Sequence, residues 1–167
     1  SINLFYTIVS TLNIVRTKIK QILSIVLPIR LPIIIKIKHY KLKVLMKNYF
    51  RGVMQHDAQD CGAACLTSII HFWGNNAPMS LIREKMKVDK SGSNFYTIGI
   101  VGEQFGLTST ALNGTLDELL EELKNNRLQL PFIAHFLNNH SKGHFVVVYK
   151  YSNSKITIFD PGEGKQV

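Results

Sequence analysis

The chemistry of this chain centres on a cysteine in the run QHDAQDCGAAC, residues 55–65. Cys61 lies between an aspartate and a glycine, directly before an apolar stretch with helical spacing. A thiol is an effective nucleophile as the thiolate, and the unpaired backbone N–H groups at a helix N-terminus lower the pKa of a thiol placed there. We therefore interpret Cys61 as a candidate nucleophile.

A cysteine hydrolase also needs a base, a group that orients the base, and hydrogen-bond donors for the oxyanion. His144 opens a strand-like segment directly after Gly143, and Asp160 ends the next such segment. Two antiparallel strands joined by a short turn would bring His144 and Asp160 side by side. Gln55, six residues before Cys61, can supply a side-chain amide donor next to the Cys61 backbone N–H.

Each of these residues also has an ordinary structural explanation. A free cysteine is often a small buried hydrophobe, and this explanation is favoured for Cys65, which lies inside the expected helix among alanines. A histidine in an edge strand, or an aspartate before a proline, needs no catalytic role. Gln59 competes with Gln55 as the oxyanion donor. The competing candidates for the base are His56, His71, His135 and His140, of which His71 is expected to be structural and His140 to lie in a solvated loop.

Charge argues against a nucleic-acid-binding domain. The formal net charge is +9, but residues 1–46 carry eight Lys and Arg and no acidic residue, which leaves twelve basic against eleven acidic residues afterwards (12 − 11 = +1). The part expected to fold therefore lacks a basic face that would neutralise many phosphates.

The two cysteines are four residues apart, with no framework of further cysteines. Neighbours on a helix have poor geometry for a disulfide, so we expect free thiols and a reducing compartment. A second pair of Cys or His at zinc-site spacing does not occur in the sequence. We expect no metal and no cofactor for this domain.

Residues 1–45 form a basic extension rich in Ile, Leu and Val. Its charged residues leave no uninterrupted apolar run near the twenty residues that a transmembrane helix needs. Residues 4–27 could form a basic amphipathic helix on a membrane surface, because Pro28 breaks the pattern only afterwards. Alternatively, and slightly favoured, the extension is not native, since Met46 begins a stretch suited to a natural start. Neither alternative makes the extension part of the core.

The domain expected over residues 46–167 has helices first and strands after. Apolar spacing predicts helices over residues 63–74, 80–88, 97–106 and 116–126. Short β-branched and aromatic runs predict antiparallel strands over residues 130–136, 143–151 and 155–161. This order predicts an α+β fold with a helical layer packed on a sheet. Because no closing element follows DPGEGKQV, we expect the sheet to lack later strands and the domain to be incomplete at its C-terminus.

Three motifs in this chain together resemble one family. The run QHDAQDCGAACLTSII, the strand GHFVVVY and the closing FDP have the order and spacing of a cysteine peptidase domain. That domain stands at the N-terminus of bacteriocin-exporting ABC transporters and removes double-glycine leader peptides. The resemblance covers roughly residues 47–163 and implies a papain-like fold. It also implies that Cys61 is the nucleophile, His144 the base, Asp160 the orienter and Gln55 the oxyanion donor.

The resemblance implies a substrate and a location as well. The reaction would be cleavage after a Gly-Gly pair in a bacteriocin or peptide-pheromone precursor, at the cytoplasmic face of the bacterial plasma membrane. The leader would bind as an amphipathic helix in a shallow hydrophobic groove, for which Phe95, Tyr96 and Phe136 are candidates. ATP would enter only through transporter domains, present in the full-length protein or as partner chains. Two alternatives stay open: a domain that binds leaders without cutting them, and a papain-like hydrolase of other amides.

Overall fold

The computed structural model describes residues 3–10, 50–136 and 143–164. In these ranges the strands are β1 (Asn3–Ser10), β2 (Thr108–Thr115), β3 (Phe132–Phe136), β4 (His144–Ser152) and β5 (Lys155–Phe159). The helices of the same ranges are α3 (Cys61–Phe72), α4 (Met79–Met86), α5 (Phe95–Gln104) and α6 (Leu116–Lys124). The strands form one antiparallel sheet with the order β2-β1-β3-β4-β5.

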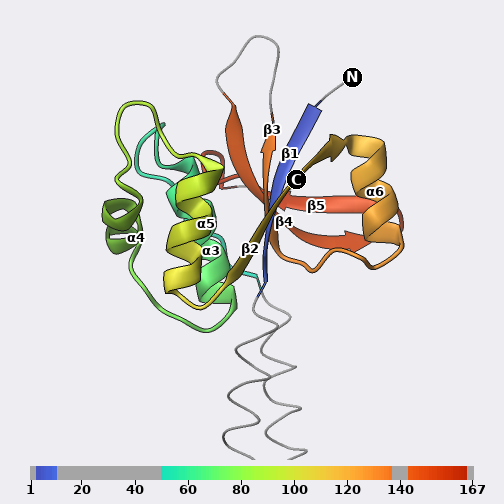
Figure 1. The fold of residues 1–167 in the computed structure, drawn as a ribbon, viewed down its shortest axis with the longest axis horizontal. Helices are drawn as coiled ribbons and strands as arrows, with labels where there is room; N and C mark the ends of the chain where they lie inside the picture. Colours follow the sequence, from blue (N-terminus) through green and yellow to red (C-terminus); the bar gives the residue numbers. More distant parts are fainter. Residues whose placement is uncertain (1–2, 11–49, 137–142, 165–167) are drawn as a thin grey trace, which may run out of the picture.

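Helices cover both faces of this sheet. α3, α4 and α5 lie on one side and α6 lies on the other (Figure 1). Successive side chains of a strand point to opposite faces, so β4 contributes to two hydrophobic cores. Phe145 and Val147 belong to the core shared with α3, whereas Val146 and Val148 pack with Leu119 of α6. The uninterrupted apolar run of β4 therefore reflects burial on both faces.

Helix α3 is the central element of the larger core. Its ten residues from Cys61 to Ile70 are all buried. The buried hydroxyls of Thr67 and Ser68 each donate a 2.7 Å hydrogen bond to a carbonyl one turn back, which satisfies them inside the helix. Ser68 Oγ also accepts a 2.8 Å hydrogen bond from the backbone N–H of Val53. The chain segment that leads to Cys61 is thereby attached to the side of α3.

The predicted α+β class is confirmed, and the predicted helices and three predicted strands correspond to α3 to α6 and β3 to β5. The order of helices first and strands after holds only in part, because β1 and β2 precede α6. β2 was not expected from the sequence. Its residues are mostly exposed and include few large apolar side chains, so no period-2 pattern marks it.

The segment Asn3–Ser10, for which the sequence predicted no strand, is part of the sheet. This segment forms β1 between β2 and β3 and pairs antiparallel with both. The possible amphipathic helix over residues 4–27 is wrong for residues 4–10, and the remainder of it lies outside the described residues. The physical reason is that NLFYTIVS is rich in β-branched and aromatic residues, and two strand edges offer it backbone hydrogen bonds. The division of the chain at residue 46 stays a prediction.

No helix in the described ranges has the length and apolar character that a membrane crossing requires.

Candidate active site

Cys61 is the first residue of α3 and is 6% exposed. Its thiol is hydrogen-bonded to the side chain of His144 and to the backbone N–H groups of Phe145 and Gly62. Burial raises the pKa of the Cys61 thiol. The opposing effects are larger: His144 lowers this pKa by its hydrogen bond and its charge, and the two backbone donors lower it further. The pKa of Cys61 therefore lies below its ordinary value. The thiolate is therefore the form that these surroundings favour.

His144 is the first residue of β4, and it lies between Cys61 and Asp160. Its Nε2 is 2.8 Å from Asp160 Oδ1, which leaves Nδ1 as the ring nitrogen for the thiol. The pKa of His144 is raised to about 9, first by the hydrogen bond with Cys61 and then, against burial, by the hydrogen bond and charge of Asp160. At neutral pH His144 is thus an imidazolium, whose charge favours the thiolate form of Cys61.

Asp160 directly follows β5 and is held in place by its own turn. Its Oδ1 accepts hydrogen bonds from the backbone N–H groups of Gly162 at 2.7 Å and Glu163 at 3.4 Å. Burial raises the pKa of Asp160, but the hydrogen bonds from His144 and these N–H groups lower it below its ordinary value. The carboxylate therefore stays charged and can hold the imidazole in one orientation.

A bulge in β4 decides which face of the sheet Asp160 occupies. The two-residue turn between β4 and β5 would by itself pair Val147 with Asp160. Instead, Val147 pairs with Phe159, because β4 contains an extra residue at Tyr149. A shift of one residue exchanges the two faces of a strand, so the bulge turns Asp160 to the face on which His144 lies. The sequence motif alone does not reveal this shift.

Gln55 lies beside the Asp160 turn. Its backbone N–H donates a 3.0 Å hydrogen bond to the carbonyl of Pro161, and its side-chain amide lies next to Gly162. Gln55 Oε1 is buried and has no hydrogen-bond partner among the described residues. The structure therefore places Gln55 at the edge of the Cys61–His144–Asp160 group. Among the described contacts, Gln55 makes no hydrogen bond with Cys61.

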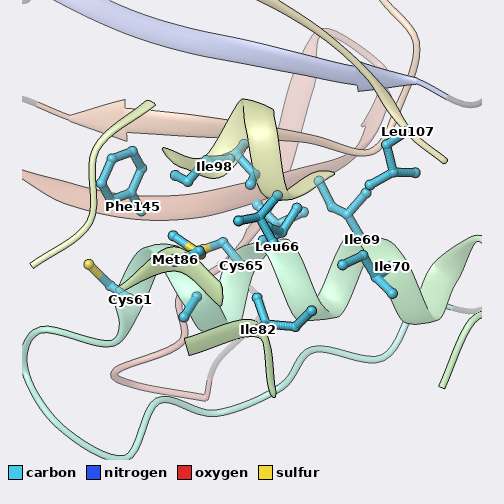
Figure 2. Packing of buried hydrophobic residues seen from close by; sticks show 14 of the residues in the cluster. Cys61, Cys65, Leu66, Ile69, Ile70, Ile82, Met86, Ile98, Leu107 and Phe145 are labelled. Atoms are coloured by element: carbon cyan, nitrogen blue, oxygen red, sulfur yellow. The ribbon is translucent and has the colours of Figure 1, made fainter. Parts of the chain in front are cut away.

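The competing residues have other surroundings. Cys65 is completely buried in the larger core, where Figure 2 shows it among Leu66, Met86 and Ile98, as the sequence led us to expect. His71 Nε2 is 2.8 Å from the carbonyl oxygen of Ala77, which confirms its structural role. His56 is exposed, and His140 lies outside the described residues.

His135 lines the site without joining the hydrogen-bonded group. Its ring packs against Phe145 and Phe95, with ring centroids 4.3 Å and 5.7 Å away. Burial lowers the pKa of His135, so the neighbouring His144 is the imidazolium of the site. The ring also lies directly against Gly143, where a larger residue would collide with it. This contact explains why a glycine precedes His144.

Sequence reasoning missed the backbone N–H of Phe145, because a main-chain donor leaves no side-chain signal. It also missed two charged residues near the start of α3, Asp60 and Arg83, which form an ion pair. The only available signal was the aspartate directly before Cys61. Among the described residues, no group of three or more His, Cys, Asp or Glu is arranged to hold a metal ion.

An α+β fold with a cysteine at a helix N-terminus, paired with a histidine and a carboxylate from a sheet, defines a papain-like cysteine hydrolase. The chain belongs to the peptidase C39 family, whose sequence pattern matches residues 49–167. It is therefore a cysteine peptidase domain, as the three motifs led us to expect.

Curated relatives agree with this assignment. The lactococcin-G-processing and transport ATP-binding protein LagD of Lactococcus lactis is 33% identical over 113 residues, which are 68% of this chain and 16% of that protein. The transport/processing ATP-binding protein ComA of Streptococcus pneumoniae is 30% identical over 118 residues, which are 71% of this chain and 16% of that protein. The matched region thus spans a small part of each of these relatives.

Solved structures show the same fold. The peptidase domain of Streptococcus ComA, described as a bifunctional ABC transporter involved in quorum sensing, has a TM-score of 0.62 at 29% identity. The match covers 71% of this chain and 85% of that domain. A double glycine motif protease from an AMS/PCAT transporter, solved in complex with the leader peptide, has a TM-score of 0.55 at 24% identity over 70% of this chain and 78% of that one. The papain-like α+β fold is confirmed by these similarities.

Proposed function

We propose that this domain cleaves leader peptides after a Gly-Gly pair in bacteriocin or peptide-pheromone precursors. The observation that carries the proposal is the hydrogen-bonded chain of Cys61, His144 and Asp160 in a member of the peptidase C39 family. Relatives whose names describe bacteriocin processing and transport, and a fold neighbour crystallised with a leader peptide, support this choice of substrate.

Cys61 acts as the nucleophile. Its thiolate Sγ forms a bond with the carbonyl carbon of the glycine before the cut, and the carbonyl π electrons move to the oxygen. When the tetrahedral species collapses, the C–N bond breaks and His144 gives its proton to the leaving amine. His144 then removes a proton from water, which attacks the thioester and releases the leader with a carboxyl end. Asp160 keeps the imidazole oriented in both steps.

Gln55 and the backbone N–H of Cys61 stabilise the oxyanion. A donor aimed at the developing negative charge lowers the barrier because its dipole is already oriented. Gln55 is half-buried, and its Nε2, the donor atom of the amide, lies next to Gly162 in the Asp160 turn, which supports a donor position beside the catalytic group. All of these groups belong to the chain itself, so the peptidase reaction is expected to proceed without a cofactor.

The leader is expected to bind through its apolar side chains, as an amphipathic helix. Of the three groove candidates, Tyr96 best supports this role, because it is 76% exposed on α5 with Ile100, 41% exposed, one turn further on the same helix. Phe95 packs inward against Phe145, and Phe136 packs against the core beside α6. An exposed aromatic and aliphatic pair of this kind offers apolar area to a helical partner.

The transporter is the second partner that we infer. The relatives that this domain resembles are ATP-binding transport proteins, so membrane-spanning and ATP-binding parts would be supplied by the same full-length protein or by partner chains. ATP would be bound there and not by the peptidase domain. Processing coupled to export would then take place at the cytoplasmic face of the bacterial plasma membrane.

A cleavage assay with two synthetic peptides tests the proposal. Both carry an amphipathic leader, one with Gly-Gly before the cut and one with Gly-Val, and products are identified by mass spectrometry. We expect cleavage directly after Gly-Gly and a loss of about 10²-fold in kcat/KM for Gly-Val, since small changes in a closely fitting subsite have effects of this size. Equal cleavage of both peptides would indicate a hydrolase of other amides, and tight binding without cleavage would indicate a binding domain.

A further inference from the structure

The carboxylate of Asp60 is an unusual group at the start of α3. Asp60 immediately precedes Cys61 and is completely buried. An aspartate at a helix N-cap ordinarily accepts a hydrogen bond from the first turn, but the Asp60 side chain makes no capping bond. A buried carboxylate is costly unless it is paired, so its partner is the informative residue.

The partner is Arg83, from α4. Arg83 Nε lies 2.8 Å from Asp60 Oδ1, in an ion pair whose angle is not that of a hydrogen bond. The same guanidinium places Nη2 3.4 Å from Asp57 Oδ2. α4 itself is anchored in the larger core by the buried side chains of Ile82 and Met86. Arg83 therefore holds two carboxylates of the loop before Cys61 from a fixed position.

The loop that Arg83 holds connects the two groups assigned to the oxyanion. A turn spans Asp57 to Asp60, where the Asp60 N–H donates to the Asp57 carbonyl at 3.0 Å and the Asp57 N–H donates to Asp60 Oδ2 at 3.3 Å. On one side of this turn, Gln55 is bonded to the carbonyl of Pro161. On the other side, Cys61 begins α3. The turn thus sets the distance and direction between Gln55 and Cys61.

We propose that Arg83 and Asp60 are positioning residues, which hold the Gln55 side chain and the Cys61 N–H in the arrangement that the oxyanion requires. Neither residue contacts the reacting atoms in this assignment. The inference rests on the proposed role of Gln55 and adds the ion pair that supports it. Catalysis would then depend on Arg83 of α4, although α4 contributes no residue to the catalytic group.

Kinetics of Arg83→Met and Gln55→Ala test the inference. Methionine keeps the aliphatic stem and removes the charge. We expect Arg83→Met to lower kcat for the Gly-Gly leader peptide by about 10- to 100-fold with KM within about two-fold, since small misplacements cost this much. Alkylation of Cys61 by iodoacetamide should keep its rate, because the thiol and His144 are unchanged. Arg83→Lys should recover part of the loss, and Lys85→Met, on the same helix, should behave like the parent.

Two further variants separate positioning from folding. In the Gln55→Ala background, Arg83→Met should cause a smaller loss of kcat than it causes in the parent, because only the placement of the Cys61 N–H is left to disturb. The double variant Asp60→Asn/Arg83→Met removes both charges, so it should regain the thermal stability lost in Arg83→Met but not its kcat. The inference would be overturned if the losses of kcat in Arg83→Met and Gln55→Ala multiplied in the double variant. It would also be overturned if Asp60→Asn/Arg83→Met regained kcat together with thermal stability. A Gln55→Ala variant with the parent's kcat would instead contradict the proposed oxyanion donor itself.

Discussion

The first and second turns of α3 each contain one cysteine, and the two cysteines behave in opposite ways. Both are buried, with Cys61 6% exposed and Cys65 fully enclosed. The pKa of Cys61 is lowered by His144 and backbone N–H groups in spite of burial. The pKa of Cys65 is raised well above its ordinary value by burial and by the charges of Cys61 and Asp160. Figure 2 shows Cys61 at the start of the helix and Cys65 inside the core.

This difference shows that burial alone does not make a cysteine inert. At the first turn, the helix leaves N–H groups unpaired and the sheet brings His144 to the thiol. At the second turn, the helix satisfies its own N–H groups and the neighbours are apolar. Reactivity therefore depends on the hydrogen-bond donors within reach of the sulfur.

The largest effect is expected when the first-turn cysteine is removed. Cys61→Ala should abolish cleavage, with a loss of about 10⁶-fold in kcat, because no other described nucleophile lies beside His144. The measurement is the rate of leader-peptide cleavage, followed by mass spectrometry. Cys65→Ala is the matched control, and it should keep the parent's kcat. If both variants lost activity, the claim that cleavage needs Cys61 and not Cys65 would be wrong.

Removing the charge of Asp160 should lower the activity of the first-turn site while leaving the Cys61 thiol in place. Asp160→Asn should lower kcat by about 10²- to 10⁴-fold, since the amide no longer favours the imidazolium or its orientation. Because the carboxylate raises the pKa of His144, the alkaline limit of activity should also move to lower pH. A pH profile of kcat/KM measures both effects. Parent-like activity in this variant would remove Asp160 from the site.

Activity should depend on pH through the thiolate–imidazolium pair. As pH rises through about 9, His144 loses its proton and kcat/KM should fall about ten-fold per pH unit. As pH falls below the lowered pKa of Cys61, the thiolate is protonated and activity should fall again. The stabilisation of the fold by the His144 proton has the same alkaline limit: it is complete below the unfolded pKa of about 6.5 and lost above about 9. A flat profile between pH 7 and 10 would contradict this pairing.

The smallest effect is expected from the second-turn cysteine, and it concerns stability. Cys65→Ala should lower the free energy of unfolding by about 1–2 kcal/mol, because a small cavity replaces the sulfur in a tightly packed core. Urea denaturation of the two proteins measures this difference. Alkylation of the native protein should modify Cys61 and spare Cys65, and labelling of both at equal rates would contradict the assigned burial.

The sequence predicted the catalytic group through local patterns. Apolar spacing indicated a helix over residues 63–74, directly after Cys61, and two β-branched runs indicated neighbouring strands that carry His144 and Asp160. One of the two unexpected strands is β2, whose mostly exposed residues leave no periodic signal. The position of Asn3–Ser10 within the sheet was missed because strand pairing depends on edges formed far away in the chain.

Local residue order by itself therefore determined which residues are candidates for the chemistry and which kinds of element carry them, since helical and strand periodicity depend on near neighbours in the chain. The tertiary structure decided how those elements face one another. The bulge at Tyr149 turns Asp160 towards His144, and the ion pair of Asp60 with Arg83 holds the loop before Cys61. The bulge is an irregularity of strand register, and the ion pair joins two segments that are distant in sequence. No pattern in the sequence marks either feature.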